Sequence, residues 1–534
     1  MLIKFGHWFW HVIVGTVDLY SLLVFVSVAL ITVKLIDYLR YNRKLPPGPW
    51  GLPLCGYLPF FKEALHLQFN DLAKKYGSIF SVSLGSELTV VMSDYRIIRD
   101  SFRREEFTGR PHNDFMNILD GYGIINSEGS LWKDQRKFLH NKLKNLGMTF
   151  LNGKNLESKI KHEVKVFLER LEMKHGVPTS LTSSLAVAIS NVICSITMGL
   201  RFYHGDPKFK RFMDLINEGF KLFAKVTFAN YIPILRYIPW NNGIRNKIEQ
   251  NRSEMADFFQ EVINEHKTAY DKNNINDILD AYLYEIEKAE EKNQEDQLFD
   301  GKNKVRQMQQ IMGDLFSAGM ETVKSTLEWS VIFMLHHPEA AKAVQDELDQ
   351  VVGRRRLPTL NDVPHLPVTE ATIQEILRRS NLVPLATTHA TTRDVMINGY
   401  MVPAGTSVIP LLYAVHMDPE LWDKPEDFRP SRFLDAEGKV YKPNFFMPFG
   451  VGRRKCLGDV LARMEIFLFF TSLLHKFNLH VPEGVALPSL QGNNGITVSP
   501  KPFTVCLLKR DLNLMDCDNN EISVNGPVRN VGSH

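Results

Sequence analysis

The chain has 534 residues, with 44% hydrophobic and 23% charged side chains, which is ordinary for a folded protein. Its formal net charge of +3 is too small to indicate a nucleic-acid partner, and we expect none. The five cysteines are odd in number, widely spaced and form no Cys-x-x-Cys pair, which argues against a disulfide framework and favours a reducing compartment. Because no Gly/Ser- or Pro-rich linker divides the middle, we expect an N-terminal anchor over residues 1–44, one large domain over residues 45–510 and a polar, loose tail over residues 511–534.

The N-terminal segment predicts a membrane anchor. Val12 to Val33 is almost continuously apolar and long enough for the roughly 20 residues that cross a bilayer. Asp18 interrupts this run, so the span can instead lie between Leu19 and Leu39. Three basic residues follow the apolar stretch, at positions 40, 43 and 44, and one precedes it, at position 4. Because the more basic flank of a membrane span stays on the cytoplasmic side, the main body is expected in the cytosol. A cleaved signal peptide is the alternative, but the run is long for one and no small-residue cleavage site follows it.

The first elements of the domain are a stiff turn and a hairpin. Leu45-Pro46-Pro47-Gly48-Pro49-Trp50-Gly51 is the turn that sets the domain off from the membrane. Ser78–Leu84 and Thr89–Met92 are rich in β-forming residues on either side of Gly85-Ser86, and they predict a β-hairpin. From about Leu156 onward the pattern becomes mostly helical.

The second half of the chain contains one very long helix. The acidic, charge-dense stretch Glu285–Asp296 is interpreted as a solvated loop between helices. A helix is then predicted from about Lys304 to His336, because the ring of Pro338 cannot continue it. Its apolar residues lie on nearly all of its faces, so the helix should be buried. Short β-like runs lie near Val395–Val402 and Thr497–Leu507. The sequence therefore predicts a mainly α protein with small β-sheets.

One cysteine lies in a specific motif. The pattern F-x-x-G-x-R-x-C-x-G is matched at all its fixed positions by Phe449-Gly450-Val451-Gly452-Arg453-Arg454-Lys455-Cys456-Leu457-Gly458. The probability that a random sequence matches it from any one starting residue is on the order of one in three million. The glycines allow a tight turn and close approach of another group, and backbone N–H groups can hydrogen-bond the sulfur. Helical sequence resumes at Asp459–Leu474, so Cys456 precedes a helix N-terminus, which favours the thiolate. A buried structural cysteine is the alternative.

This loop resembles the haem-binding loop of the cytochrome P-450 superfamily, and the resemblance covers about Pro46 to Lys509. The resemblance implies the mainly α fold of that superfamily, with the long central helix over the haem. It also implies heme b as the cofactor, with Cys456 as the metal ligand, an axial thiolate that pushes electron density onto the iron and favours O–O cleavage. Phe449 and Arg454 then contact the cofactor, Arg454 by pairing with a haem propionate. The activity implied is that of a monooxygenase, which inserts one oxygen atom from O2 into a substrate.

Three further residues match propionate partners of the family. Trp132 and Arg136 have the W-x-x-x-R spacing that places both side chains on one helix face. His389 lies in Thr387-Thr388-His389-Ala390-Thr391-Thr392-Arg393-Asp394, which matches another such partner. As isolated residues, the tryptophan would be a core residue and the histidine a surface one.

The long helix contains the segment Ala318-Gly319-Met320-Glu321-Thr322, which resembles the family's oxygen-binding segment. Gly319 is expected to relax the helix, so that a turn opens where O2 and water can lie beside the iron, together with Ala318. Thr322 can hold a water that protonates the oxygen, with Glu321 in the proton relay. The alternative is a threonine that hydrogen-bonds to its own helix and a solvated glutamate.

A structural ion pair is expected next to the haem loop. Glu375 and Arg378 have i, i+3 spacing in Val368–Arg379, which has a helical pattern. In the family such a pair is joined by an arginine from a later loop, and Arg432 fits that position. The local match is weakened by Ser431, which stands where many relatives carry glutamate.

Electrons must come from a partner, because no G-x-G-x-x-G fingerprint opens a helix in this chain. By the same resemblance, basic residues gather on the cysteine side of the haem, and they are Lys133, Lys137, Lys142, Lys144, Arg453 and Lys455. A basic face suits an acidic electron donor, which for an anchored, cytosol-facing enzyme of the endoplasmic reticulum would be NADPH–cytochrome P-450 reductase.

By the family resemblance, the walls of a substrate pocket are expected at residues 110–125, 202–223, 228–240, 311–322, 382–388 and 490–497. These apolar segments and an anchor in the lipid bilayer imply a lipophilic substrate. Residues 368–379, 385–400 and 449–470 are similar to insect ecdysteroid 26-hydroxylases within the family, which implies side-chain hydroxylation and inactivation of a steroid hormone. Asn230, Asn493 and Asn494 are candidate polar contacts for substrate hydroxyls. The alternatives are a xenobiotic-oxidising monooxygenase, a haem-thiolate isomerase or dehydratase that needs no external electrons, and a non-catalytic haem sensor.

Overall fold

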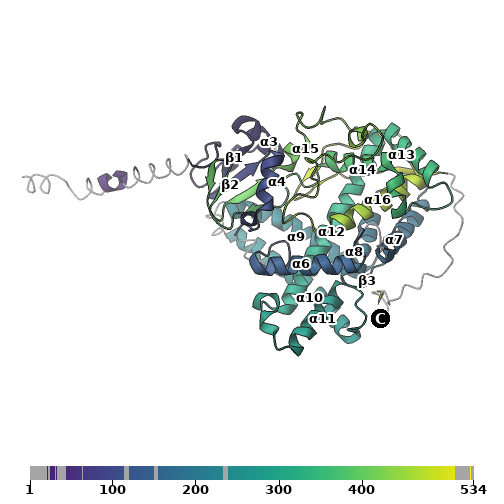
Figure 1. The fold of residues 1–534 in the computed structure, drawn as a ribbon, viewed down its shortest axis with the longest axis horizontal. Helices are drawn as coiled ribbons and strands as arrows, with labels where there is room; N and C mark the ends of the chain where they lie inside the picture. The colour runs from purple at the N-terminus through teal and green to yellow at the C-terminus, as the bar shows by residue number, and fades with distance from the viewer. Residues whose placement is uncertain are drawn as a thin grey trace, which may run out of the picture.

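The computed structural model describes residues 44–62, 64–112, 120–149, 154–231 and 239–510, together with residues 21, 24–29, 32, 529 and 530 (Figure 1). The described part is mainly helical with small sheets, as expected. The α-helices of the domain are α3 Leu65–Tyr76, α4 Tyr95–Arg103, α6 Gly129–Asn145, α7 Lys154–Glu172, α8 Thr182–Thr197, α9 Pro207–Tyr231, α10 Pro239–Ala269, α11 Ile278–Glu291, α12 Lys304–His336, α13 Pro338–Val351, α14 Pro367–Ser380, α15 Leu412–His416 and α16 Asp459–Lys476.

The strands form one four-stranded sheet and several two-stranded ones. They are β1 Ile79–Leu84, β2 Glu87–Met92, β3 Leu200–Arg201, β4 His389–Ala390, β5 Val395–Ile397, β6 Tyr400–Val402, β7 Ser407–Pro410, β8 Phe477–His480, β9 Asn493–Asn494, β10 Val498–Ser499, β11 Cys506–Lys509 and β12 Arg529–Asn530. The larger sheet has the order β1-β2-β7-β4, with β2 and β7 parallel and the other pairs antiparallel. The β-like runs expected near residues 395–402 and 497–507 are confirmed as β5–β6 and as β10 and β11.

The predicted hairpin is confirmed with the expected turn. Ile79 pairs with Met92 and Leu84 with Glu87, so Gly85 and Ser86 form the connection. Gly85 has φ +60°, and a Cβ there would lie 1.6 Å from the carbonyl oxygen of Tyr231. Only glycine fits this conformation beside another backbone.

The long helix α12 has the bounds that the sequence predicts, Lys304–His336. The side chain of Asn303 caps its first turn by accepting from the Arg306 N–H, and Pro338 begins the next helix. Most of its residues are buried, and α8, α10, α14 and α16 pack against it. Figure 1 shows α12 near the middle of the helical part.

The prediction of a loop over Glu285–Asp296 is wrong for its first part, because helix α11 continues to Glu291. Asp277 caps this helix by accepting from the Asp280 N–H, and Ile278 and Tyr282 bury one side of it. The charged residues occupy its other faces, where Glu285 pairs with Lys142 of α6 at 3.5 Å. A dense run of charges is therefore compatible with a helix whose apolar residues share one face.

The predicted anchor over residues 1–44 falls mainly outside the described residues, and so does the tail over residues 511–534 apart from β12. Within the part of the chain that the structure describes, none of the helices combines the length and the apolar character that crossing a bilayer requires.

A buried ion pair joins α14 to the loop that precedes the cysteine. Glu375 and Arg378 are fully buried and form two hydrogen bonds of 2.8 Å. Arg432 joins them at 3.3 Å, as expected, and Ser431 is exposed. Arg378 also donates to the carbonyl oxygens of His416 and Pro425, both at 2.8 Å. Each charge is thus compensated, which is what makes such a pair tolerable inside a protein.

We expect Glu375→Ala to lower the free energy of unfolding by about 3–5 kcal/mol, because it leaves Arg378 buried without its carboxylate. Chemical denaturation measures the loss. The free energy of unfolding of Glu375→Gln should lie between those of the wild type and Glu375→Ala, because glutamine keeps one hydrogen-bond acceptor. Asp71→Ala, which removes an exposed pair with Lys74, is the control and should leave the midpoint unchanged. Equal midpoints for Glu375→Ala and this control would contradict the assignment.

A second buried carboxyl has no such compensation. Glu465 on α16 is fully buried, and neither of its carboxyl oxygens has a hydrogen-bond partner among the described residues. Burial raises the pKa of this group well above its ordinary value. The side chain therefore stays protonated in the folded protein under conditions in which the unfolded chain ionises.

The raised pKa predicts a pH-dependent loss of stability. The contribution of Glu465 is fully present below its unfolded-state pKa of about 4.3 and is lost as the pH rises through the raised pKa of the folded state. Glu465→Gln has no proton to lose, so the stability of the variant relative to wild type should increase with pH. Urea denaturation from pH 4 upward checks this, and parallel profiles for the two proteins would rule it out.

Candidate functional site

The cysteine motif forms a loop that is held from both ends. The Cys456 N–H donates to the carbonyl oxygen of Phe449 at 3.0 Å, which closes the loop just before α16. Gly452 has φ +79°, and a Cβ there would lie 2.0 Å from the carbonyl oxygen of Phe102 on α4. The Arg453 N–H donates to that same oxygen at 3.0 Å. The glycine is thus required by the close approach of α4.

Cys456 lies in the wall of a cavity of about 510 Å³ that is lined partly by charged side chains, and the residue counts as exposed. Nevertheless, burial raises the pKa of the thiol, and the Gly458 N–H and Arg136 lower it by less. The start of α16 thus favours the thiolate as expected, through the Gly458 N–H, but in the protein alone the effect of burial is larger. A bound metal ion would deprotonate it, since a coordinating thiol loses its proton.

The oxygen-binding segment of α12 differs in detail from expectation. The helix is continuous through Gly319, so the opened turn is absent. A Cβ at Gly319 would lie 2.7 Å from Ile193 of α8, so this glycine allows the two helices to pack closely. The Thr322 hydroxyl donates to the carbonyl oxygen of Ala318 at 2.7 Å, and Ala318 itself is exposed although the helix around it is largely buried. An open space therefore borders the helix at this turn.

Three arginines meet near the cysteine. Arg454 donates to the carbonyl oxygens of Thr108 and Ser127 at 2.8 and 2.6 Å, and its guanidinium lies 4.2 Å from the ring centre of Trp132. Arg110 donates to the carbonyl oxygens of Ile125 and Thr388, both at 2.8 Å. The acceptors of these hydrogen bonds are backbone carbonyl oxygens, which carry no net charge. The contacts therefore orient the two guanidinium groups without neutralising them.

Arg136 and His389 complete the cluster. Arg136, one helical turn after Trp132 on α6, donates to the carbonyl oxygen of Lys455. His389 is buried on β4, where Nδ1 lies 2.7 Å from the carbonyl oxygen of Phe107. Four of the sequence-predicted cofactor residues, namely Trp132, Arg136, His389 and Arg454, are thus brought into one neighbourhood. Phe449, the fifth of these residues, lies in the cysteine loop, and the centre of its ring is 4.6 Å from the guanidinium carbon of Arg463.

The electrostatics of this cluster favour an anion. Burial, together with the charges of neighbouring arginines, lowers the pKa of Arg454 to about 8 and that of Arg110 to about 10. Burial and the charges of Arg110 and Arg454 also hold the pKa of His389 well below its usual range. Among the described residues, Glu128 is the carboxylate whose charge opposes these shifts at Arg110 and Arg454. A cofactor with two carboxylates fits such a cluster, and haem has two propionates.

Sequence reasoning missed two residues of this region. Arg110 was expected only at the edge of a pocket wall, although its place between Gly109 and Pro111 was a usable sign of a fixed turn. Asp314 was not singled out, yet it is fully buried in α12 and accepts from the N–H groups of Ile124 and Ile125 at 2.7 and 3.0 Å. Burial raises the pKa of Asp314 despite these bonds. This side chain fastens the segment that supports Arg110 to the long helix.

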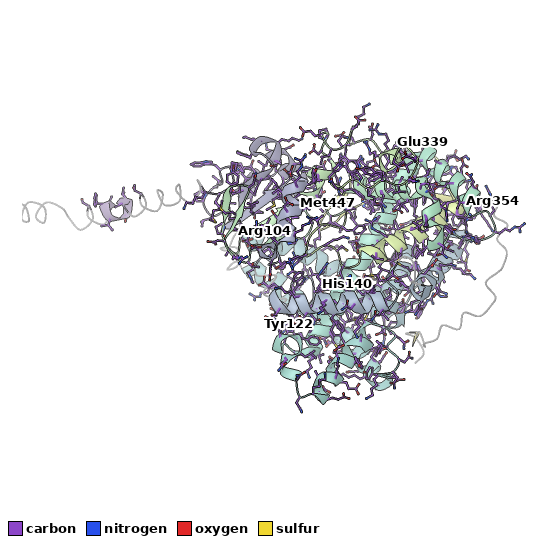
Figure 2. All side chains as sticks on the ribbon, in the orientation of Figure 1. Arg104, Tyr122, His140, Glu339, Arg354 and Met447 are labelled. Atoms are coloured by element: carbon purple, nitrogen blue, oxygen red, sulfur yellow. The ribbon has the colours of Figure 1, made fainter. Side chains whose placement is uncertain are left out.

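The basic face is confirmed only in part. The cavity beside Cys456 is bordered by Arg136, His140, Lys144 and Lys455, and Figure 2 labels His140 on α6. Three members of the expected set have acidic partners, because Lys133 pairs with Glu105, Lys142 with Glu285 and Lys455 with Asp459. The net positive charge of this surface is smaller than a count of its lysines indicates.

The pocket walls are described incompletely. The expected wall segments 110–125 and 228–240 include residues 113–119 and 232–238, which lie outside the described residues, as does the side chain of Asn230. Asn493 and Asn494 form β9 and are exposed, with the Asn493 amide donating to the carbonyl oxygen of Pro500 at 3.4 Å.

Comparison with known proteins identifies relatives over almost the whole chain. The model of the cytochrome P450 family matches residues 46–507. Cytochrome P450 18a1 of Drosophila melanogaster is 56% identical over 518 residues, which cover 96% of this chain and 95% of the relative. Cytochrome P450 2U1 of Rattus norvegicus is 36% identical, with 89% and 93% covered, and cytochrome P450 2D6 of Homo sapiens is 36% identical, with 93% and 100% covered.

We predict that the arginine cluster recognises carboxylates. The protein stripped of cofactor should bind haem about tenfold to a hundredfold more tightly than haem whose propionates are methyl esters, because charge-assisted hydrogen bonds are lost. Arg110→Met should reduce that preference, whereas Arg355→Met, at an exposed arginine, should not. Titration by quenching of tryptophan fluorescence measures both affinities. Equal affinity of the wild type for haem and its diester would show that the cluster has another role.

Proposed function

The chain belongs to the cytochrome P450 family, and from that membership we propose that it is a monooxygenase that hydroxylates the side chain of an ecdysteroid, with Cys456 as the axial ligand of haem iron. The single observation that carries the haem assignment is the meeting of Arg110, Arg136 and Arg454 beside Cys456, because a cofactor with two carboxylates and a metal matches both halves of the site. The charge of Arg136 acts on Cys456 as well as on Arg454, so the two halves are close enough to interact.

The protein's own residues would bind and orient this cofactor. Arg454, Arg110 and Arg136 would donate to the propionates, while the Arg454 guanidinium lies over the Trp132 ring, which helps to hold it in place. His389 is neutral in this environment, so it can take part as a hydrogen-bonding group rather than as a charge. Phe449 closes the cysteine loop through its carbonyl oxygen. When bound, the haem would supply the activation of O2 that no side chain can provide.

On the other side of the site, α12 would provide the proton path. The Thr322 hydroxyl donates to Ala318, so its oxygen remains able to accept a hydrogen bond from water. Glu321 precedes it and is partly buried. In this proposal Thr322 holds a water at the open space beside Ala318, and Glu321 passes a proton toward it. Gly319 keeps α12 close to α8 and so sets the position of this turn.

The substrate assignment is supported by sequence. Residues 368–379, 385–400 and 449–470 are similar to insect ecdysteroid 26-hydroxylases, and the relative that shares 56% identity is also from an insect. Electrons would come from NADPH–cytochrome P-450 reductase, which the cavity lined by Arg136, Lys144 and Lys455 suits. An anchor within residues 1–44 would hold the enzyme on the endoplasmic reticulum membrane, with the domain in the cytosol.

Reconstitution with reductase, NADPH and an ecdysteroid tests the proposed function. We expect mass spectrometry to find a product with one added oxygen atom, and the reduced protein under carbon monoxide to show the thiolate-type Soret shift. Cys456→Ser should keep the fold but lose that shift. A normal thiolate spectrum without product would remove the ecdysteroid assignment and leave the haem site standing. Absence of the shift in intact wild-type protein would contradict Cys456 as the ligand.

A further inference from the structure

Three side chains of the kinds that bind metal ions meet where the end of α10 packs against the start of α11. They are His266 in the last turn of α10, Asp277 at the N-cap of α11 and Asp280 in its first turn. One ring nitrogen or carboxylate oxygen of each lies within 4.8 Å of the others. Figure 1 shows α10 and α11 together at one end of the molecule. Neither helix contributes a residue to the candidate site described above, so the proposed activity does not explain this cluster.

The cluster is buried and holds two carboxylates. Asp277 and Asp280 are 2% and 8% exposed, and the His266 side chain is 10% exposed. His266 Nε2 lies 3.0 Å from Asp277 Oδ2. Lys159, whose charge also acts on Asp277, donates to the carbonyl oxygen of Ser195. Buried carboxylates are costly unless cations compensate them. A proton on His266 balances one of the two, whereas a divalent ion beside a neutral ring balances both.

The orientation of His266 favours metal binding through Nε2. The other ring nitrogen, Nδ1, lies 3.1 Å from the carbonyl oxygen of Val262, one turn earlier on α10. A carbonyl oxygen only accepts, so Nδ1 carries a hydrogen atom and the neutral ring has its lone pair on Nε2, which faces Asp277. Metal-binding histidines are commonly fixed in this way, by a carbonyl oxygen at the nitrogen that does not bind the metal. This contact lies outside the cluster and is therefore independent of it.

The backbone directs the carboxylates and leaves room beside them. Asp277 Oδ1 accepts from the Asp280 N–H at 2.9 Å, and Asp280 Oδ2 accepts from the Asn276 N–H at 3.1 Å. Gly199, in the turn after α8, borders the same atoms and has φ +59°. A Cβ at Gly199 would lie 2.8 Å from Asp277 Oδ2 and 3.7 Å from His266 Nε2, so these two atoms face a position without a side chain. The small exposed area of His266 gives water and metal ions access from solvent.

We propose that His266, Asp277 and Asp280 form a binding site for a divalent metal ion of the zinc type, with water completing the coordination. Imidazole nitrogen and carboxylate oxygen are ligands that zinc accepts, and three protein ligands with one water occur in known zinc sites. The imidazole favours zinc over magnesium and calcium, which prefer oxygen ligands. The ion joins the end of α10 to the start of α11, so its role is structural. The inference is independent of the proposed monooxygenase function.

Zinc binding to the haem-loaded, full-length protein tests the site. The protein is treated with EDTA, dialysed against buffered zinc and analysed for bound metal, with haem iron counted separately. We expect one zinc ion per chain, and a melting temperature that rises by about 3 °C when free zinc is roughly a hundred times the dissociation constant. X-ray absorption at the zinc edge should show one imidazole nitrogen at about 2.0 Å among oxygen ligands.

Asp277→Asn is the main variant, because asparagine keeps the helix cap and removes the charge that would bind the metal. It should weaken zinc binding by more than about tenfold, since even changes to residues that only orient a ligand cost that much. His266→Gln should weaken binding by at least as much. Asp94→Asn is the matched control and should bind zinc as the wild type does. Asp94 caps α4 in the same way, by accepting from the N–H groups of Arg96 and Ile97.

Two results would overturn this inference. If the wild type takes up no more zinc than Asp277→Asn, His266 and Asp277 form only a hydrogen-bonded pair. If His162→Gln, at an exposed histidine of α7, lowers zinc uptake as much as Asp277→Asn does, the zinc is bound by surface histidines. The carbon monoxide spectrum reports on the haem site separately. Its absence in the wild type would count against the proposed function and leave the zinc result standing.

Discussion

The buried pair between Glu375 and Arg378 determines where the cysteine loop lies. Arg378 holds the carbonyl oxygens of His416 and Pro425, so one side chain organises two turns of a segment that has little regular structure. Burial lowers the pKa of His416 to about 3, which keeps its ring neutral, and its Nε2 accepts from the Met447 N–H at 3.2 Å. Met447, labelled in Figure 2, lies two residues before Phe449, where the loop begins. The chain of contacts thus runs from α14 to the proposed ligand.

The arginine cluster shows the opposite use of burial. Around Glu375 each charge has a partner, whereas Arg110 and Arg454 are directed by neutral carbonyl groups and repel each other. Without a bound anion the charged forms of these arginines are destabilised, because like charges repel one another in surroundings of low polarity. A site built this way binds its ligand tightly at the expense of the stability of the empty protein. Haem would therefore contribute to folding as well as to chemistry.

Helix α12 combines packing with the proposed chemistry in a single element. Its buried residues hold α8, α14 and α16 together, and Asp314 fastens the segment that supports Arg110. Ala318 borders an open space, and farther along the helix Glu321 and Glu328 accept from a lysine and from a hydroxyl of α8. A helix buried on nearly all sides can carry these polar groups because each is satisfied within the structure, by a backbone N–H, a hydroxyl or an opposite charge.

The sequence by itself determined the features that depend on local backbone preferences. The bounds of α12, the hairpin around Gly85-Ser86 and the position of Cys456 just before α16 all follow from turn residues, helix stops and periodicity within short windows. The motif of the cysteine loop likewise predicted the family that the comparison shows.

Tertiary structure decided everything that depends on burial or on partners distant in the chain. It made Arg110 part of the site by bringing it against Thr388, and it showed that Gly319 serves the contact with Ile193 rather than an opened turn. It also buried the Cys456 thiol, which raises its pKa against the effect of the helix N-terminus, and it paired Glu321 with Lys324. The free energy of a charge depends on which groups surround it in space, and this information appears only when segments hundreds of residues apart are packed together.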